Sequence, residues 1–194
     1  MFTTRGLVLV SLFSGVFLAY GYVSGVSLPQ AITHSLDLFF LIATLFTILA
    51  LEIRQSWSAT LLGTITGVIF LGTPTAPNAP SYHITLALVV NGLAFDLCLR
   101  VMSRRTIPPS RGQMVTAAAV GNLVMAVVGL SALQPTITIP TLLWPVLVAA
   151  TTLIGAAGAL FGIAVVRRLR VSTRNQTRTL TMETSTIQPV QIRQ

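Results

Sequence analysis

The stretch "LVVNGLAFDLCLR", residues 88–100, carries Asn91, Asp96 and Arg100 in an otherwise apolar run. The run extends to about residues 83–103, which is the length that a helix needs to cross a bilayer. An acidic side chain inside such a segment is costly, and the whole chain has only four acidic residues. The meaning of Asp96 therefore depends on whether the rest of the chain has the same membrane-like character.

The composition indicates a membrane protein. Of the 194 residues, 53% are hydrophobic and 8% are charged, whereas about a quarter of the residues of a soluble domain are charged. Five further apolar stretches have roughly spanning length, and short connectors rich in Pro and small polar residues separate most of them; they cover about 6–26, 35–53, 57–72, 114–133 and 141–166. We therefore predict an all-α polytopic membrane protein with six transmembrane helices over residues 1–170.

The basic residues predict the topology. All twelve are arginines, and all lie on one side of the membrane if each of the six segments crosses it. The positive-inside rule then places both termini in the cytoplasm of a multi-pass cell-membrane protein. The net charge of +8 is explained by these connectors, so we do not expect nucleic acid as a partner.

Two segments allow a second interpretation. Residues 57–72 would span only about 24 Å, less than the roughly 30 Å of a hydrocarbon core, so a re-entrant loop is the alternative to a short spanning helix. A segment that turned back would move the arginines after segment four to the other side, and the charge pattern therefore favours crossing. Residues 1–25 also resemble a secretory signal, although an uncleaved anchor is the preferred interpretation.

The tail, residues 171–194, is rich in Thr and Arg and has no apolar period. Such a composition cannot bury enough apolar surface to offset the entropy of ordering. We predict that it is a disordered cytoplasmic tail.

Asp96 lies one helical turn before Arg100, so the two side chains share a helix face. We predict an ion pair in which Arg100 extends toward the interface and Asp96 lies about 6 Å deeper. The alternative is a functional acid that contacts a partner subunit or a coupling ion.

Asn91 and Asn122 are expected at a similar depth, about 12 Å into the membrane for Asn122. Two amides at one level can hydrogen-bond each other and hold helices together. They can equally line a polar pocket for a ligand, and the sequence does not decide between the two.

We find no pattern that predicts catalysis. The chain has no nucleophile–base set, phosphate-binding loop or haem motif, so we expect neither an enzyme nor a cofactor. His34, His83 and Asp37 are too few and too scattered for a predicted metal site.

Small residues recur at four-residue spacing on several segments, which allows helix backbones to approach closely. The first segment has Ser11, Gly15 and Ala19; the third has Gly63 and Gly67; the sixth has Gly158 and Gly162. Packing inside the bundle explains most of this pattern, and the stripe on the first segment can also dock a separate membrane protein.

Three stretches resemble the substrate-binding S components of energy-coupling-factor (ECF) vitamin transporters. They are "HSLDLFFLIATLFTILALEIRQSWSATLLGTITGVIFLG" at 34–72, "VVNGLAFDLCLR" at 89–100 and "LIGAAGALFGIAVVRRLR" at 153–170. Members of that family have six helices, cytoplasmic termini and a small-residue stripe on the first helix that docks the coupling subunit. Ser11, Gly15 and Ala19 have the matching spacing here.

The resemblance implies a subunit that binds a small water-soluble vitamin or precursor in its outer half. Release would be energised by a separate transmembrane coupling subunit and a pair of ATPases. Asn91, His83, Trp144 and Asn122 are then the expected hydrogen-bonding and stacking partners of the ligand. The second hypothesis is a structural or accessory subunit of a larger membrane complex, such as a respiratory assembly.

Overall fold

The computed structural model describes residues 3–27, 31–53, 55–72, 82–103, 109–133 and 140–186. Within these ranges the chain forms only helices, and each apolar stretch expected from the sequence lies on one of them. The helices are α1 (Thr4–Ser27), α2 (Ala31–Ile53), α3 (Ser58–Leu71), α4 (Tyr82–Met102), α5 (Arg111–Leu133), the short 3-10 helix η2 (Thr141–Leu143) and α6 (Trp144–Thr186). The all-α prediction is confirmed.

Within the described ranges, five spans are long and apolar enough to cross a membrane by length and composition: Thr4–Val23, Leu36–Ile53, Tyr82–Met102, Arg111–Ala132 and Trp144–Ser172. Helix α3 has 14 residues, about 21 Å at the usual rise, and is shorter than a hydrocarbon core. Helix α3 nevertheless packs along α4. Near its start Thr60 bonds Asp96 of α4, and near its end the carbonyl of Gly67 accepts a hydrogen bond from Thr85 of α4. Helix α3 is therefore a continuous short helix packed on α4, and its crossing of the membrane stays a prediction.

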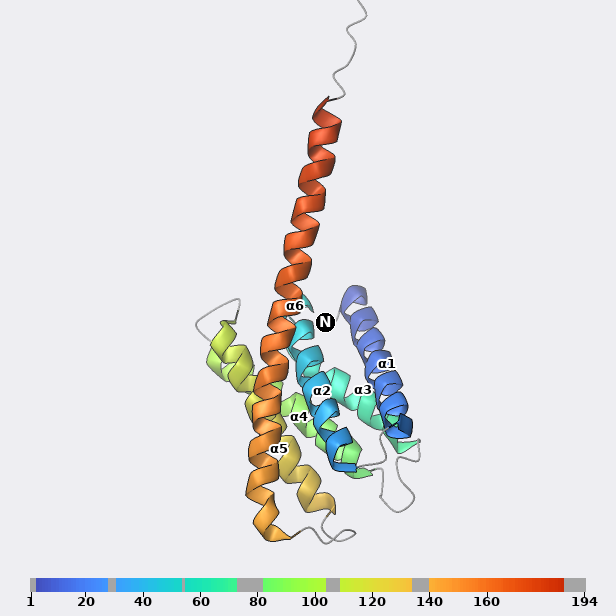
Figure 1. The fold of residues 1–194 in the computed structure, drawn as a ribbon, viewed down its shortest axis with the longest axis vertical. Coiled ribbons are helices and arrows are strands. Elements are labelled where there is room, and N and C mark those ends of the chain that lie inside the picture. Colours follow the sequence, from blue (N-terminus) through green and yellow to red (C-terminus); the bar gives the residue numbers. More distant parts are fainter. Residues whose placement is uncertain are drawn as a thin grey trace, which may run out of the picture.

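Helices α2, α6, α5, α4 and α3 pack on one another in that order around the bundle, and α1 packs on α2 and α3 (Figure 1). Among its described side chains, residues 36–53, helix α2 has no exposed large hydrophobic residue, whereas α1, α3, α4, α5 and α6 all do. A helix that is apolar on every side is normally buried, and α2 is the buried helix of this bundle. The core includes Phe46 and Phe95, whose ring centroids lie 5.6 Å apart.

Close helix approaches depend on glycine. A side chain at Gly63 would collide with the backbone of Leu88, and one at Gly92 would collide with the backbone of Ala59. Gly158 similarly faces the backbone of Phe40, where α6 crosses α2. The predicted role of small residues in internal packing is therefore confirmed for α3 and α6, and Gly92 of α4, which was not among the predicted positions, has the same role.

We call the end of the bundle where α1 begins and α2 ends the arginine end. Arg5 and Arg170 both pair with Glu52 there, while Arg111, Arg167 and Arg168 line one pocket. The prediction that arginines gather on one side is confirmed for these residues. Arg54, Arg104 and Arg105 lie outside the described residues, and the cytoplasmic orientation of this end stays a prediction.

Helix α6 continues without interruption to Thr186 and projects beyond the bundle (Figure 1). This differs from the disordered tail predicted from residue 171. The physical reason is that the sequence contains no Gly or Pro between Gly162 and Pro189, so no helix-terminating residue follows the membrane segment. Residues 187–194 lie outside the described part of the chain.

Candidate functional site

Asp96 caps the first turn of α3. Its Oδ2 atom accepts hydrogen bonds from the backbone N–H of Thr60 and from the Thr60 hydroxyl, both at 2.8 Å. Asp96 is 8% exposed, so these hydrogen bonds are shielded from bulk water. A carboxylate at this position satisfies a free N–H of the first turn and interacts favourably with the helix dipole.

The cap comes from another helix because α3 supplies none of its own. Trp57, at the N-cap position, has a left-handed backbone with φ 72° and makes no side-chain cap hydrogen bond. The first turn of α3 lies beside α4, with Thr60 against Asp96 and Trp57 against Arg100 one helical turn further along α4. The acid in the apolar run thus compensates for a helix end buried in the bundle.

Arg100 has a different partner. Its guanidinium lies 5.6 Å from the ring centroid of Trp57, a cation–π distance. The ion pairs within the described residues do not include Asp96 with Arg100. The predicted ion pair between Asp96 and Arg100 is therefore corrected. The i, i+4 spacing allows such a pair, but the charge-assisted hydrogen bonds to Thr60 are stronger and orient the Asp96 carboxylate toward α3.

Asn91 and Asn122 meet, as their predicted depth allowed. The Asn91 amide donates to Asn122 Oδ1 at 3.3 Å and to the sulfur of Met125 at 3.0 Å. The Asn122 amide donates to the backbone carbonyls of Phe39 and Thr151, both at 3.2 Å. Both asparagines are 1% exposed, and their bonds join α2, α4, α5 and α6.

This network favours the packing interpretation of the two amides. Their bonds go to the protein itself, and a built Cβ at Gly155 would lie 2.7 Å from Asn122 Nδ2, so α6 packs directly on the amide. Hydrogen bonds of this kind stabilise helix association in membranes by about 0.6 kcal/mol each on average. Their role as ligand contacts stays a prediction.

His83 and Trp144 lie at the end opposite the arginines, near the starts of α4 and α6. His83 is 8% exposed and lies edge-on to the ring of Tyr82. Trp144 is half-buried, and its Nε1 atom is buried without a hydrogen-bond partner in the described part of the chain. An indole N–H in this state is a donor available to an acceptor outside the described residues.

The small-residue stripe of α1 faces away from the bundle. Ser11, Gly15 and Ala19 are all exposed, and a side-chain carbon at Gly15 would meet no atom of the described residues within 4 Å. The opposite face of α1 is the buried one, where Ser14 accepts a hydrogen bond from Thr66 and Phe17 packs edge-on against Phe70. Unlike Gly63 and Gly158, Gly15 has no atom of the described residues in front of its Cβ position, and Ser11 and Ala19 are exposed beside it.

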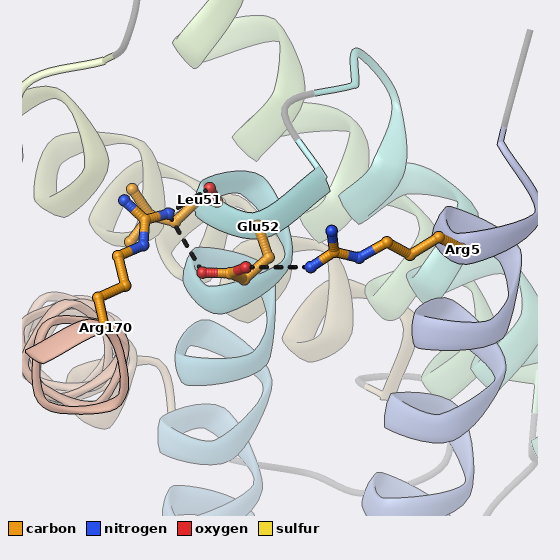
Figure 2. Close-up of polar contacts among 4 residues, drawn as sticks. All are labelled: Arg5, Leu51, Glu52 and Arg170. Atoms are coloured by element: carbon orange, nitrogen blue, oxygen red, sulfur yellow. Dashed lines mark hydrogen bonds and ion pairs between the residues drawn. The ribbon is translucent and has the colours of Figure 1, made fainter. Parts of the chain in front are cut away.

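The sequence did not reveal an ionic clamp at the arginine end. The Glu52 carboxylate lies 3.6 Å from Arg5 of α1 and 3.1 Å from Arg170 of α6, and Arg170 also donates to the carbonyl of Leu51 (Figure 2). The signal that could have found it is charge count. Glu52 is one of only four acids in the chain. Helices α1 and α6 each bring an arginine to it.

Among the described residues, no three His, Cys, Asp or Glu side chains are grouped to hold a metal ion. Asp37 is exposed, and the side chain of His34 lies outside the described residues. The arrangement offers helix caps, amide bridges and an exposed face of small residues on α1.

The fold and these contacts define an all-α polytopic membrane protein. Comparison with known proteins finds no family model, curated protein or solved structure that matches the chain significantly.

Proposed function

We propose that this protein is the substrate-binding subunit of an ECF-type uptake system for a small water-soluble vitamin or precursor. The observation that carries the proposal is the outward α1 stripe of Ser11, Gly15 and Ala19. A six-helix bundle with a small-residue face on its first helix is what the resemblance to S components leads us to expect.

The stripe is suited to a transmembrane partner. Small residues allow two backbones to come close, and van der Waals packing then drives association where lipid provides no hydrophobic force. Gly63 and Gly158 show how this chain uses such residues when a helix is opposite them. The same residue type at Gly15 has open space in front of it, so a coupling subunit is the partner that we assign to this face.

Energy for transport comes from elsewhere in this proposal. The sequence carries no Gly-rich phosphate-binding motif, so separate ATPase subunits drive the cycle through the coupling subunit. The chain itself provides the binding site and moves against its partner.

The ligand site is placed at the end opposite the arginines. Trp144 is its first candidate, because a half-buried indole can stack on a heteroaromatic ring and its N–H has no hydrogen-bond partner among the described residues. His83 lies at the same end. Asn91 and Asn122 are weaker candidates, since a ligand would have to displace bonds between four helices.

The test of partner docking is co-purification of the full chain from its own membranes, compared between Gly15→Leu and Val16→Leu. Both positions are exposed on α1, but Val16 lies about 100° around the helix from the stripe. We expect Gly15→Leu to lose the coupling and ATPase subunits and Val16→Leu to keep them. Equal recovery of partners with both variants would contradict docking through this face.

The second candidate, a structural subunit of a larger membrane complex, is favoured by one observation. The asparagine network is bonded within the protein, as expected of a bundle built for rigidity. A small molecule that co-purifies with the chain and is lost on Trp144→Phe supports the transporter subunit. A stable set of partners without such a molecule supports the structural one.

A further inference from the structure

An arginine-lined pocket lies at the arginine end, between the start of α5 and the middle of α6. Its volume is about 730 Å³, and its lining includes Arg111, Arg167 and Arg168 together with Leu160, Ile163 and Ala164. The volume is in the range of sites that hold small molecules. Neither the asparagine network nor the α1 stripe contributes to it.

The three arginines carry charge that the described part of the protein does not neutralise. Of the acids there, Glu52 pairs with Arg5 and Arg170, and Asp96 bonds to Thr60. Asp37 is near the start of α2, at the other end of the bundle. The backbone of Glu183 lies about 22 Å further along α6 than Arg168, at the usual helical rise.

The charged and apolar parts of the pocket lining lie at different heights along α6. Leu160 precedes Arg167 by about 10 Å along the axis of α6, in the direction of the membrane segment. Leu160 is 57% exposed and Ala164 is also exposed, so this apolar part of the lining is open at the protein surface. The start of α5 is held in place by Ser110 and Gln113, whose side chains each bond the other's backbone N–H.

We propose that this pocket binds the headgroup of an anionic phospholipid, with Arg111, Arg167 and Arg168 around the phosphate and an acyl chain along Leu160, Ile163 and Ala164. Charge complementarity supports the headgroup, and the adjoining apolar lining favours a lipid over a soluble phosphate. Basic pockets between transmembrane helices bind anionic headgroups in this way. The proposal does not depend on the proposed function.

The test is native mass spectrometry of the full chain released from nanodiscs that contain equal amounts of phosphatidylglycerol and phosphatidylcholine. An arginine near an anionic headgroup favours binding roughly fivefold, so three arginines predict at least about a tenfold preference for phosphatidylglycerol. The variant Arg111→Gln/Arg167→Gln/Arg168→Gln is expected to bind the two lipids equally. The matched control Arg174→Gln/Arg178→Gln/Arg193→Gln, which loses the same charge, is expected to keep the preference.

A second variant removes the apolar seat and leaves every charge in place. Ala164 is exposed, so Ala164→Trp fills the pocket without entering the core, and it too should abolish the preference. Equal binding of both lipids by the natural chain overturns the proposal, as does an equal loss in pocket and control variants. Arginine-dependent retention of added inorganic phosphate without a lipid preference overturns the assignment to lipid.

Discussion

Substitutions of Asp96 test whether its carboxylate stabilises the protein by capping α3 or by forming an ion pair with Arg100. Asp96→Ala removes both 2.8 Å bonds to Thr60 and leaves the first turn of α3 uncapped inside the bundle. Loss of a cap costs about 1–2 kcal/mol, and the hydroxyl bond to a charged group adds about 1.5 kcal/mol. We therefore expect a loss of about 2–4 kcal/mol in the free energy of unfolding.

Two further variants test the cause. Asp96→Asn keeps an acceptor at the same place without the charge, and we expect a loss of about 1 kcal/mol. Arg100→Gln removes only the contact with Trp57, and its cost is expected to be about 0.5–1 kcal/mol. A double-mutant cycle of Asp96→Ala with Thr60→Ala is expected to show a coupling of about 1 kcal/mol or more.

The assay is a reversible denaturant titration in mixed micelles, followed by tryptophan fluorescence and by circular dichroism. Trp57 lies beside the capped turn and reports on it directly. If Arg100→Gln is as destabilising as Asp96→Ala, the acid acts through the ion pair and the capping account is refuted. An Asp96→Ala protein as stable as the natural chain refutes both.

Three other predictions concern packing, and each is checked by the same titration. Gly92→Leu is expected to lower the free energy of unfolding by about 3 kcal/mol or more, because the new side chain meets the backbone of Ala59. The control Gly112→Ala, at a position with open space around it, should change that free energy by less than about 1 kcal/mol. Asn122→Leu removes three interhelical bonds and should cost about 2 kcal/mol; an unchanged midpoint would mean that the network contributes no stability. Glu52→Gln breaks a partly exposed ionic clamp and should cost less than about 1 kcal/mol, so a larger loss would show that α1 depends on it.

Much of the fold could be predicted because length and hydropathy decide it. Each apolar stretch lies on one helix, and even the unusual shortness of α3 was visible in residues 57–72. The continuation of α6 to Thr186 was not predicted, because composition gives weak information about a polar segment that extends an existing helix.

The partners of polar side chains were harder to predict. Local spacing pointed Asp96 to Arg100, whereas its actual partner, Thr60, lies on another helix. That choice depends on where α3 begins in space, which the sequence does not state. The meeting of Asn91 with Asn122 was among the expectations because helix rise alone sets both depths.

The sequence also did not predict that the α1 stripe faces away from the bundle. Helix α1 has apolar residues on every side, such as Val10 on the buried face and Val8 on the exposed one, so no polar face marks which side meets the bundle. Only the packing of Ser14 and Phe17 on α3 fixes Gly15 outward.

The measurement that tests the proposed function most directly is native mass spectrometry of the natural chain, gently solubilised from its own membranes. The account predicts a complex with coupling and ATPase subunits and a retained small molecule of a few hundred daltons, which Trp144→Phe releases. A chain that carries no such molecule and is bound to other membrane subunits would contradict it.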